Sequence, residues 1–158
     1  MKQDHLSWMR NYLEQIYQTP ILENFLKLQI IEIEEGKIIY STKIIDRHCN
    51  RYGFIHGGTL ASISDVAMGV SCQTLGKRVV TIDMSISYIK NAPTATGTTL
   101  TAVGKVISNG KTIMRAIGEI FNKQELLVRS QASYFVIGDF CEDDYHQPEK
   151  IDDNFPEG

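Results

Sequence analysis

"FIHGGTLASISD", residues 54–65, opens the segment that predicts the central helix of this chain. Apolar residues recur at helical spacing from Thr59 to about Leu75, small residues lie between them, and Gly76 follows as the expected stop. A helix with so many small side chains can pack closely against a sheet. Gly69, inside the helix, costs on the order of 1 kcal/mol relative to alanine and suggests close contact with another backbone; the alternative is a glycine that is merely tolerated there.

A hairpin is predicted before this helix, in residues 28–44. On its first arm Ile31 and Ile33 alternate with glutamates, and a turn is expected near Gly36. The second arm places three residues on one face: Ile38, Tyr40 and Thr42.

Four strand patterns follow the helix, at residues 79–90, 98–108, 112–122 and 125–137. In the first of them, alternation sets one group of residues opposite another: Ile82, Met84, Ile86 and Tyr88 against Thr81, Asp83, Ser85 and Ser87. Between the second and third patterns, Asn109-Gly110 predicts a type I′ turn and therefore a tight hairpin.

The order of these elements predicts the fold class. An amphipathic helix at about residues 5–17, behind Asp4 as a cap and before Pro20 as a stop, precedes the hairpin. The chain is therefore expected to be an α+β domain, in which a curled antiparallel β-sheet of about six strands covers the long central helix.

Length and charge limit the domain count and the partners. With 158 residues, 42% of them hydrophobic, the chain can bury one core, and we expect one domain (1–138) and a poorly ordered acidic tail (139–158). The tail carries eight acidic side chains and one basic, so the net charge of −3 leaves about +4 on the domain. That charge suits a polyanionic small molecule. It falls short of the basic stripe of a nucleic-acid binder, so no nucleic-acid partner is expected.

Several site classes are not expected. No apolar run approaches the roughly 18 to 20 residues that span a bilayer, and no secretory signal opens the chain, so we expect no membrane association and a cytoplasmic location. The three cysteines have unrelated spacings and form no C-x-x-C pair, which favours reduced thiols. His48 and Cys49 are expected to pack a loop, because no second ligand pair stands at a useful spacing.

Gly57 and Gly58 stand where the central helix should begin. The first amides of a helix have no partner within it and lie at the positive end of its dipole, so they can polarise a carbonyl or hold an anion. Glycine would leave these donors open to a substrate. The alternative is a tight turn that needs only the conformational freedom of glycine.

Asp65 follows Gly57 by eight residues, which is about 12 Å along a helix axis and roughly 80° around it. One chain therefore cannot bring both residues to one carbonyl. Two such helices, antiparallel across a twofold axis and roughly 8 to 10 Å apart, would let each N-terminus face the second or third turn of its partner. The alternative for Asp65 is an exposed polar side chain, or one bonded to a neighbouring strand.

The motif N-x-x-G-x-x-H-G-G-x-x-x-x-x-x-D runs from Asn50 to Asp65, and "VTIDMSISYIKNAP" and "SNGK" follow it. Over roughly residues 27–137 the chain resembles the PaaI-type hotdog-fold acyl-CoA thioesterases. The resemblance implies a hotdog fold, with the sheet wrapped around the long helix, and an acyl-CoA substrate. It also implies a homodimer with shared active sites, whose sheets join edge to edge, and a pairing of dimers into a homotetramer.

The resemblance also implies roles for residues. Asp65 would attack the thioester or activate water, and the backbone amide of Gly57 from the other subunit would bind the carbonyl oxygen. Asn50 would orient the thioester or the attacking water, with His56 beside it, and the Thr81 hydroxyl would position the nucleophile. For coenzyme A the resemblance points to Tyr88, Ser108, Asn109, Gly110, Lys111, Thr112, Ile113 and Phe135.

The chemistry agrees with these roles and leaves simpler alternatives at the hairpin. A preorganised backbone donor aimed at the developing oxyanion is worth about 3 to 4 kcal/mol of barrier, and Gly57 could supply it. Lys111 suits a phosphate as a flexible point charge, or is an ordinary solvated turn lysine. Asn109 and Gly110 have an alternative role in the turn alone.

Two other functions stay open. A hotdog hydratase or dehydratase would act on hydroxyacyl or enoyl thioesters, but its His-Phe-Pro and Asp-x-Asn-Pro-x-His patterns are missing. A non-catalytic acyl-CoA sensor would not need a carboxylate near an electrophilic carbonyl. No metal or redox cofactor is expected, and coenzyme A enters only as part of the substrate.

Overall fold

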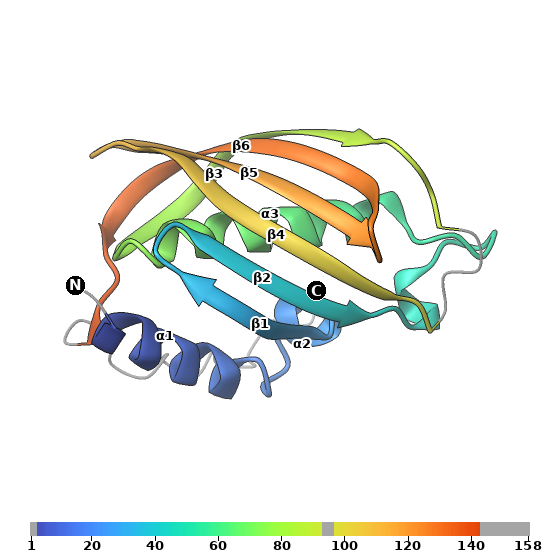
Figure 1. The fold of residues 1–158 in the computed structure, drawn as a ribbon, viewed down its shortest axis with the longest axis horizontal. Coiled ribbons are helices and arrows are strands. Elements are labelled where there is room, and N and C mark those ends of the chain that lie inside the picture. The colour runs from blue at the N-terminus through green and yellow to red at the C-terminus, as the bar shows by residue number, and fades with distance from the viewer. Residues whose placement is uncertain (1–2, 93–96, 143–158) are drawn as a thin grey trace, which may run out of the picture.

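A six-stranded antiparallel sheet wraps around one long helix, α3 (Gly57–Gln73), in the computed structural model of the chain (Figure 1). The structure describes residues 3–92 and 97–142. The strand order is β1-β2-β4-β5-β6-β3, so β1 and β3 are the two edges. The strands are β1 (Leu28–Glu34), β2 (Lys37–Lys43), β3 (Lys77–Tyr88), β4 (Thr99–Asn109), β5 (Ile113–Asn122) and β6 (Glu125–Asp139). The predicted α+β class and the sheet around a central helix are confirmed.

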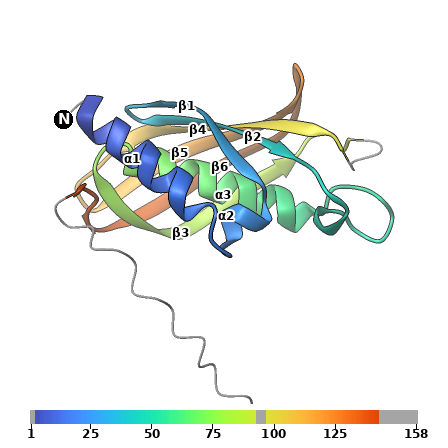
Figure 2. The same ribbon diagram turned by 90° about the horizontal axis from the view of Figure 1, so that it is seen from below.

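Helix α1 (Gln3–Ile16) is the amphipathic helix predicted at about residues 5–17. It lies below β1 in Figure 1 and crosses in front of α3 when the protein is seen from below (Figure 2). Met9 and Leu13 are buried in one cluster with Ile63 of α3. Helix α1 is therefore part of the same core as the central helix.

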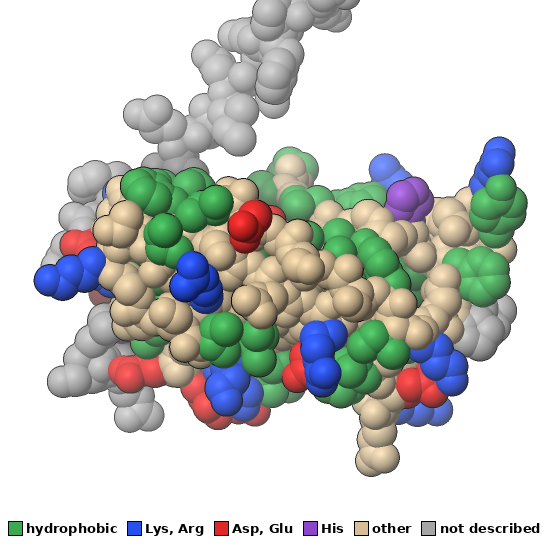
Figure 3. All heavy atoms as spheres, turned by 90° about the horizontal axis from the view of Figure 1, so that it is seen from above, with side chains coloured by type: hydrophobic (Ala, Val, Ile, Leu, Met, Phe, Trp, Pro, Cys, Tyr) green, Lys and Arg blue, Asp and Glu red, His purple; other side chains and the backbone are tan. Residues whose placement is uncertain are grey.

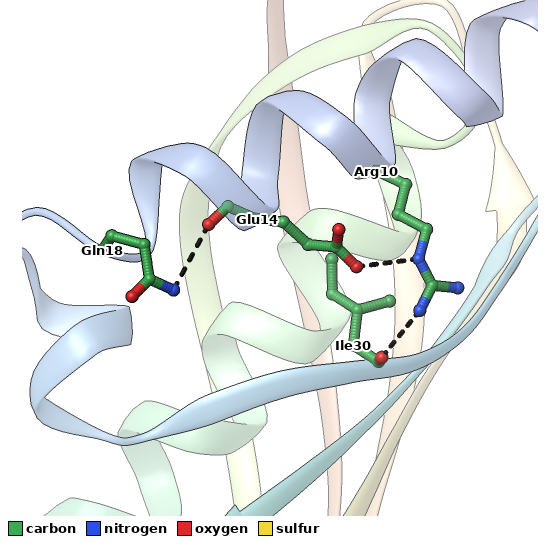
Figure 4. A network of polar contacts seen from close by, with 4 residues as sticks. All are labelled: Arg10, Glu14, Gln18 and Ile30. Atoms are coloured by element: carbon green, nitrogen blue, oxygen red, sulfur yellow. Dashed lines mark hydrogen bonds and ion pairs between the residues drawn. The ribbon is translucent and has the colours of Figure 1, made fainter.

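Polar side chains fasten α1 to the sheet. Arg10 donates to Glu14 Oε1 at 2.9 Å and to the carbonyl of Ile30 in β1 at 3.0 Å, and Gln18 donates to the carbonyl of Glu14 at 3.5 Å (Figure 4). The ion pair is half-exposed and adds little stability, whereas the bond to Ile30 ties helix to strand. Asp4 lies within the first turn of α1, so its predicted place as the cap is wrong.

The predicted first hairpin is formed by β1 and β2, which pair antiparallel around Gly36, where φ is 77°. The face predicted on its second arm is confirmed, because Ile38, Tyr40 and Thr42 are all buried. A short helix, α2 (Leu22–Phe25), precedes β1, and a 3-10 turn, η1 (Asp46–His48), follows β2.

The sheet comes very close to the backbone of α3 at β4. A Cβ on Gly104 would overlap the carbonyl of Ala67, so glycine is required there. The sequence pointed to Gly69 for such an approach to another backbone, and that prediction is wrong. The nearest neighbour of a Cβ at Gly69 would be a ring carbon of Tyr134, at 3.4 Å.

Four exposed isoleucines are the extra residues of β-bulges. Shifts of register leave Ile31, Ile82, Ile107 and Ile137 without a cross-strand partner within the described sheet, and their exposed fractions lie between 51% and 56%. A bulge resets the alternation of faces. The predicted shared faces of Ile31 with Ile33, and of Ile82 with Met84, are therefore wrong.

Strands β4 and β5 pair as the predicted hairpin, but their turn differs from the prediction. The pairing ends at Asn109 and Met114, and neither Asn109 nor Gly110 is among the described residues with positive φ. A type I′ turn needs positive φ at both central residues, so that prediction is wrong. Gly110 is needed for space instead, because a Cβ there would overlap the carbonyl oxygen of Ile113.

The packed part of the chain extends past residue 138, the predicted end of the domain. Strand β6 runs to Asp139, and Phe140 is buried with its ring 5.2 Å from that of Trp8. Residues 143–158, most of the predicted acidic tail, lie outside the described residues. In the part of the chain that is described, no helix has the length and apolar character needed to cross a membrane.

Candidate active site

A carboxylate on the central helix meets two hydroxyls from the sheet. Asp65 is half-buried, and its Oδ1 accepts hydrogen bonds from Thr81 Oγ1 on β3 and from the Tyr134 hydroxyl on β6, both at 2.9 Å. The Tyr134 hydroxyl also lies 3.0 Å from the carbonyl oxygen of Asp65. Within the described residues, Oδ2 of Asp65 accepts no hydrogen bond. We call Asp65, Thr81 and Tyr134 the carboxylate half of the site.

The bulge at Ile82 turns Thr81 towards the helix. In a regular strand Thr81 and Met84 would lie on opposite faces, as the sequence predicts. The register differs by one residue on the two sides of Ile82, so Thr81 lies on the helix-facing side of the sheet together with Met84, where it stays exposed and reaches Asp65. Thr81 therefore lies beside the carboxylate, as the resemblance implies, although its predicted face is wrong.

Tyr134 is the member of this group that the sequence patterns did not single out. It is 2% exposed, and burial, with the negative charge of Asp65 as the next cause, raises the pKa of its hydroxyl far above the ordinary value of 10.0. The hydroxyl is therefore protonated at neutral pH and donates. The sequence offers one hint of this role, a tyrosine in the pattern of a strand. A tyrosine on the buried face of a strand needs a hydrogen-bond partner for its hydroxyl.

The N-terminus of α3 forms a second cluster. His56 caps the helix, since its Nδ1 accepts a hydrogen bond from the amide of Gly58 at 2.9 Å. The Tyr88 hydroxyl donates to the carbonyl of Gly57 at 2.8 Å. The Gly57 amide has no hydrogen-bond partner among the residues described. We call Gly57, its cap His56 and the neighbouring Tyr88 the amide half of the site.

Asn50 lies in the loop before α3, and backbone amides of this loop bind the oxygen of its side chain. Its Oδ1 accepts from the amides of Tyr52 at 2.9 Å and Phe54 at 3.2 Å. Its Nδ2 group makes no hydrogen bond within residues 3–92 and 97–142, so it is available for the predicted role.

His48 is buried, with Nε2 2.6 Å from the carbonyl oxygen of Phe25, which confirms its predicted role in loop packing.

Gly57 and Asp65 do not meet within one chain. They lie eight residues apart on α3, about 12 Å along its axis, as predicted. Strand β3 is an edge of the sheet and exposes the apolar side chains of Val80 and Ile82.

No group of three or more His, Cys, Asp and Glu side chains is placed to hold a metal ion among the described residues.

The hairpin residues predicted to bind coenzyme A lie at the other end of the helix. Ser108 and Asn109 line a groove together with Leu75, which follows α3. The helix separates this groove from Gly57 by roughly 25 Å. Next to the groove, three further predicted residues connect β4 to β5: Gly110, Lys111 and Thr112.

Ile113 and Phe135 lie on the outer face of the sheet. They are cross-strand partners, 40% and 44% exposed, and Val80 pairs with Phe135 on its other side. Figure 3 looks onto this side of the protein, where hydrophobic side chains lie among acidic and basic ones. Phe135 follows Tyr134 and therefore points away from Asp65. One chain brings Ile113 and Phe135 together, but on the opposite face from the carboxylate half.

Comparison with known families places these clusters in context. The model of the thioesterase superfamily matches residues 52–129, which include both halves of the site except Tyr134. Acyl-coenzyme A thioesterase 13 of Mus musculus is 26% identical over 118 residues, covering 73% of this chain and 83% of the relative. Acyl-coenzyme A thioesterase PaaI of Escherichia coli is 27% identical over 124 residues, covering 78% and 86%.

Solved structures agree with the sequence comparison. The E. coli PaaI protein superposes with a TM-score of 0.75 at 25% identity, covering 85% of this chain and 98% of that one. A hypothetical thioesterase protein of Streptococcus pneumoniae, solved with coenzyme A, gives a TM-score of 0.70 at 27% identity, covering 73% and 93%. The similarity therefore spans the sheet, the central helix and the loop between them.

Proposed function

The chain belongs to the thioesterase superfamily and has the PaaI-type hotdog fold, and on that premise we propose that it hydrolyses a small or medium acyl-CoA or aryl-CoA thioester to the free acid and coenzyme A. One observation carries the proposal. Asp65 stands on the central helix with one carboxylate oxygen bonded to two hydroxyls, and its other oxygen has no hydrogen-bond partner among the described residues. A similar protein named acyl-CoA thioesterase, and another solved with coenzyme A, support the substrate class.

The open oxygen, Oδ2 of Asp65, can act by two routes. As a nucleophile it adds to the thioester carbonyl, the coenzyme A thiolate leaves and takes a proton, and water then opens the anhydride. As a base it takes a proton from a water molecule, which attacks the carbonyl in its place. One turnover in ¹⁸O-labelled water identifies the nucleophilic route when the label enters Asp65. Direct attack by water labels the acid, whereas an anhydride opened at the aspartyl carbonyl labels Asp65.

The carbonyl oxygen needs a donor, and the Gly57 amide of the same chain lies too far from Asp65 to be that donor. We propose that two copies pair through β3, so that the Gly57 amide of one copy faces the thioester held at Asp65 of the other. Three features support this pairing: the 12 Å or so between the two residues on one helix, the unoccupied edge of the described sheet at β3, and the exposed Val80 and Ile82 on that edge.

We further propose that the hairpin residues and the outer-face pair of Ile113 and Phe135 bind coenzyme A. Lys111 is exposed at the turn, where its ammonium can meet a phosphate, and the exposed aromatic ring of Phe135 can pack against an apolar part of the ligand. A cytoplasmic location is also a proposal. The three cysteines have unrelated spacings and form no C-x-x-C pair, a usage that suits a reducing compartment.

A panel of acyl-CoA thioesters tests the proposed reaction. Purified protein is incubated with acetyl, medium-chain, long-chain and aryl thioesters, and thiol release is followed with a trapping dye. We expect release from small, medium or aryl thioesters. Absence of release from every member of the panel would contradict the proposal.

Crotonyl-CoA separates the two other functions from hydrolysis. Hydration removes the enoyl absorbance without releasing thiol, and a sensor raises the melting temperature of the protein while the thioester is recovered intact. We expect thiol release to account for all of the consumed thioester in this assay.

A further inference from the structure

The hydroxyl of Tyr134 contacts Asp65, and the lack of a side chain at Gly69 leaves room for the tyrosine ring beside it. The hydroxyl of Tyr134 lies 2.9 Å from Oδ1 and 3.0 Å from the carbonyl oxygen of this aspartate. The tyrosine is nearly fully buried, in a cluster that includes Met68, Cys72 and Met114. The packing of its ring therefore fixes where the hydroxyl can lie.

Gly69 gives the ring its access to the helix. In an α-helix a side chain leans over the turn before it, so a side chain at position 69 would lie near the carbonyl of Asp65, four residues earlier. A Cβ at Gly69 would already touch a ring carbon of Tyr134 at 3.4 Å. A side chain larger than alanine would displace the ring. The glycine, which costs helix stability, thus has a local reason: it leaves room for a tyrosine to reach the aspartate.

Two donors from neighbouring strands hold the same oxygen. Thr81 of β3 and Tyr134 of β6 are cross-strand partners, and both donate to Oδ1 of Asp65. A carboxylate whose first oxygen is fixed by two donors has little freedom to rotate. Its second oxygen then points in one direction, to the side not occupied by these hydroxyls.

The protonation state of Tyr134 suits this task. Burial, and after it the negative charge of Asp65, raises the pKa of the hydroxyl far above its ordinary range. At neutral pH the hydroxyl therefore carries its proton and donates. Its bond to Asp65 therefore does not weaken by titration of the tyrosine.

We propose that Tyr134, seated against Gly69, is a positioning residue that orients the Asp65 carboxylate for thioester cleavage. This inference rests on the proposed thioesterase function. Tyr134 is too deeply buried to contact the substrate, and it acts through Asp65 alone. It does not bind coenzyme A or the acyl group, so its effect falls on turnover and not on substrate binding.

The test compares Tyr134→Phe with Ser130→Ala. Phenylalanine keeps the ring and removes the hydroxyl. Ser130 is a matched control, because it is also buried on the inner face of β6 and its hydroxyl donates to the carbonyl of Gly118 at 3.3 Å, not to Asp65. Kinetics are measured where circular dichroism shows both variants fully folded, and the ¹³Cγ resonance of Asp65 is recorded for each.

We expect Tyr134→Phe to lower kcat by about tenfold or more, which corresponds to about 1.4 kcal/mol, and to leave KM within about twofold. The Asp65 resonance should move in this variant. Ser130→Ala should leave kcat and the resonance unchanged.

Two results would overturn the inference: a Tyr134→Phe variant with wild-type kcat, or an unmoved Asp65 resonance. A wild-type protein that releases no thiol would instead remove the proposed function. In that case the resonance still decides whether Tyr134 holds Asp65.

Discussion

The two halves of the site are built differently. The carboxylate half is complete in one chain, because Asp65 on α3 is held by hydroxyls from β3 and β6 at 2.9 Å. In the amide half, His56 accepts from the Gly58 amide and Tyr88 donates to the Gly57 carbonyl. The Gly57 amide itself has no partner within the described chain. The difference separates two tasks. One half orients a reacting group, and the other keeps a donor open for a substrate oxygen.

The largest expected effect comes from removing the charge of the carboxylate half. Asp65→Asn keeps the shape of the side chain but removes the nucleophile or base, so thiol release should fall on the order of a thousandfold or more. Asp4→Asn, at an exposed aspartate in the first turn of α1 and outside both halves and the proposed pairing strand, is the control and should keep wild-type activity. Near-normal turnover by folded Asp65→Asn protein would remove this half from the chemistry.

The amide half can be tested by deleting a single N–H. Gly57 is the first residue of α3, where proline is well tolerated, and the preceding His56 has φ −62° and ψ 134°, which suit a residue before proline. Gly57→Pro should therefore fold and lose about a hundredfold to a thousandfold in kcat. Gly57→Ala keeps the amide, and its Cβ would only touch the Tyr88 hydroxyl at 3.4 Å.

Equal activities of Gly57→Pro and Gly57→Ala would contradict the role assigned to the amide half. In that outcome the open amide would have no part in binding the carbonyl oxygen, and the glycine pair would be a turn element alone.

A smaller effect, on stability, is expected at the cap of the amide half. His56→Ala removes the acceptor for the Gly58 amide and should lower the free energy of unfolding by about 0.5 to 2 kcal/mol. His56→Asn, which restores a good capping side chain, should recover most of it. Thermal melts of the two variants check this. A catalytic loss as large as that of Gly57→Pro in both variants would mean that His56 takes part in the chemistry directly.

The smallest effect concerns the packing beside the carboxylate half. Cys72 lies in the Tyr134 cluster, and burial raises the pKa of its thiol from 9.0 to about 12. Below that pH the thiol of the folded protein stays protonated and unreactive. Mass spectrometry after treatment with iodoacetamide at pH 8 should show Cys72 unmodified in the native protein and modified after unfolding. Rapid native labelling would mean that this cluster opens to solvent.

The elements that follow a regular period could be predicted from the sequence. Helical spacing placed α3 well, and the alternation of Ile38, Tyr40 and Thr42 placed β2. The bulges could not be predicted, because an extra isoleucine such as Ile82 looks like one more apolar residue in the alternation, and only the register with β6 reveals it. For this reason the face of Thr81 was predicted wrongly.

In the site, too, local residues could be predicted from the sequence and tertiary contacts could not. The resemblance pointed to Asp65, Gly57 and Thr81 through a local motif. Tyr134 lies 69 residues from Asp65 in the chain, and their contact depends on how β6 packs against the helix. A glycine inside a helix, such as Gly69, is visible in the sequence as an exception, but its neighbour is a tertiary feature that no local pattern contains. That neighbour is the ring of Tyr134 and not the expected backbone.

Complementation between copies tests most directly whether the two halves work across a pair of chains. Asp65→Asn and Gly57→Pro proteins, each nearly inactive alone, are mixed in equal amounts and refolded together. A mixed dimer then has one site with both halves intact, so activity should return to about a quarter of the wild-type level with random pairing. If verified mixed dimers show no more activity than the two parents, the carboxylate and the amide do not meet across two copies, and the account is wrong.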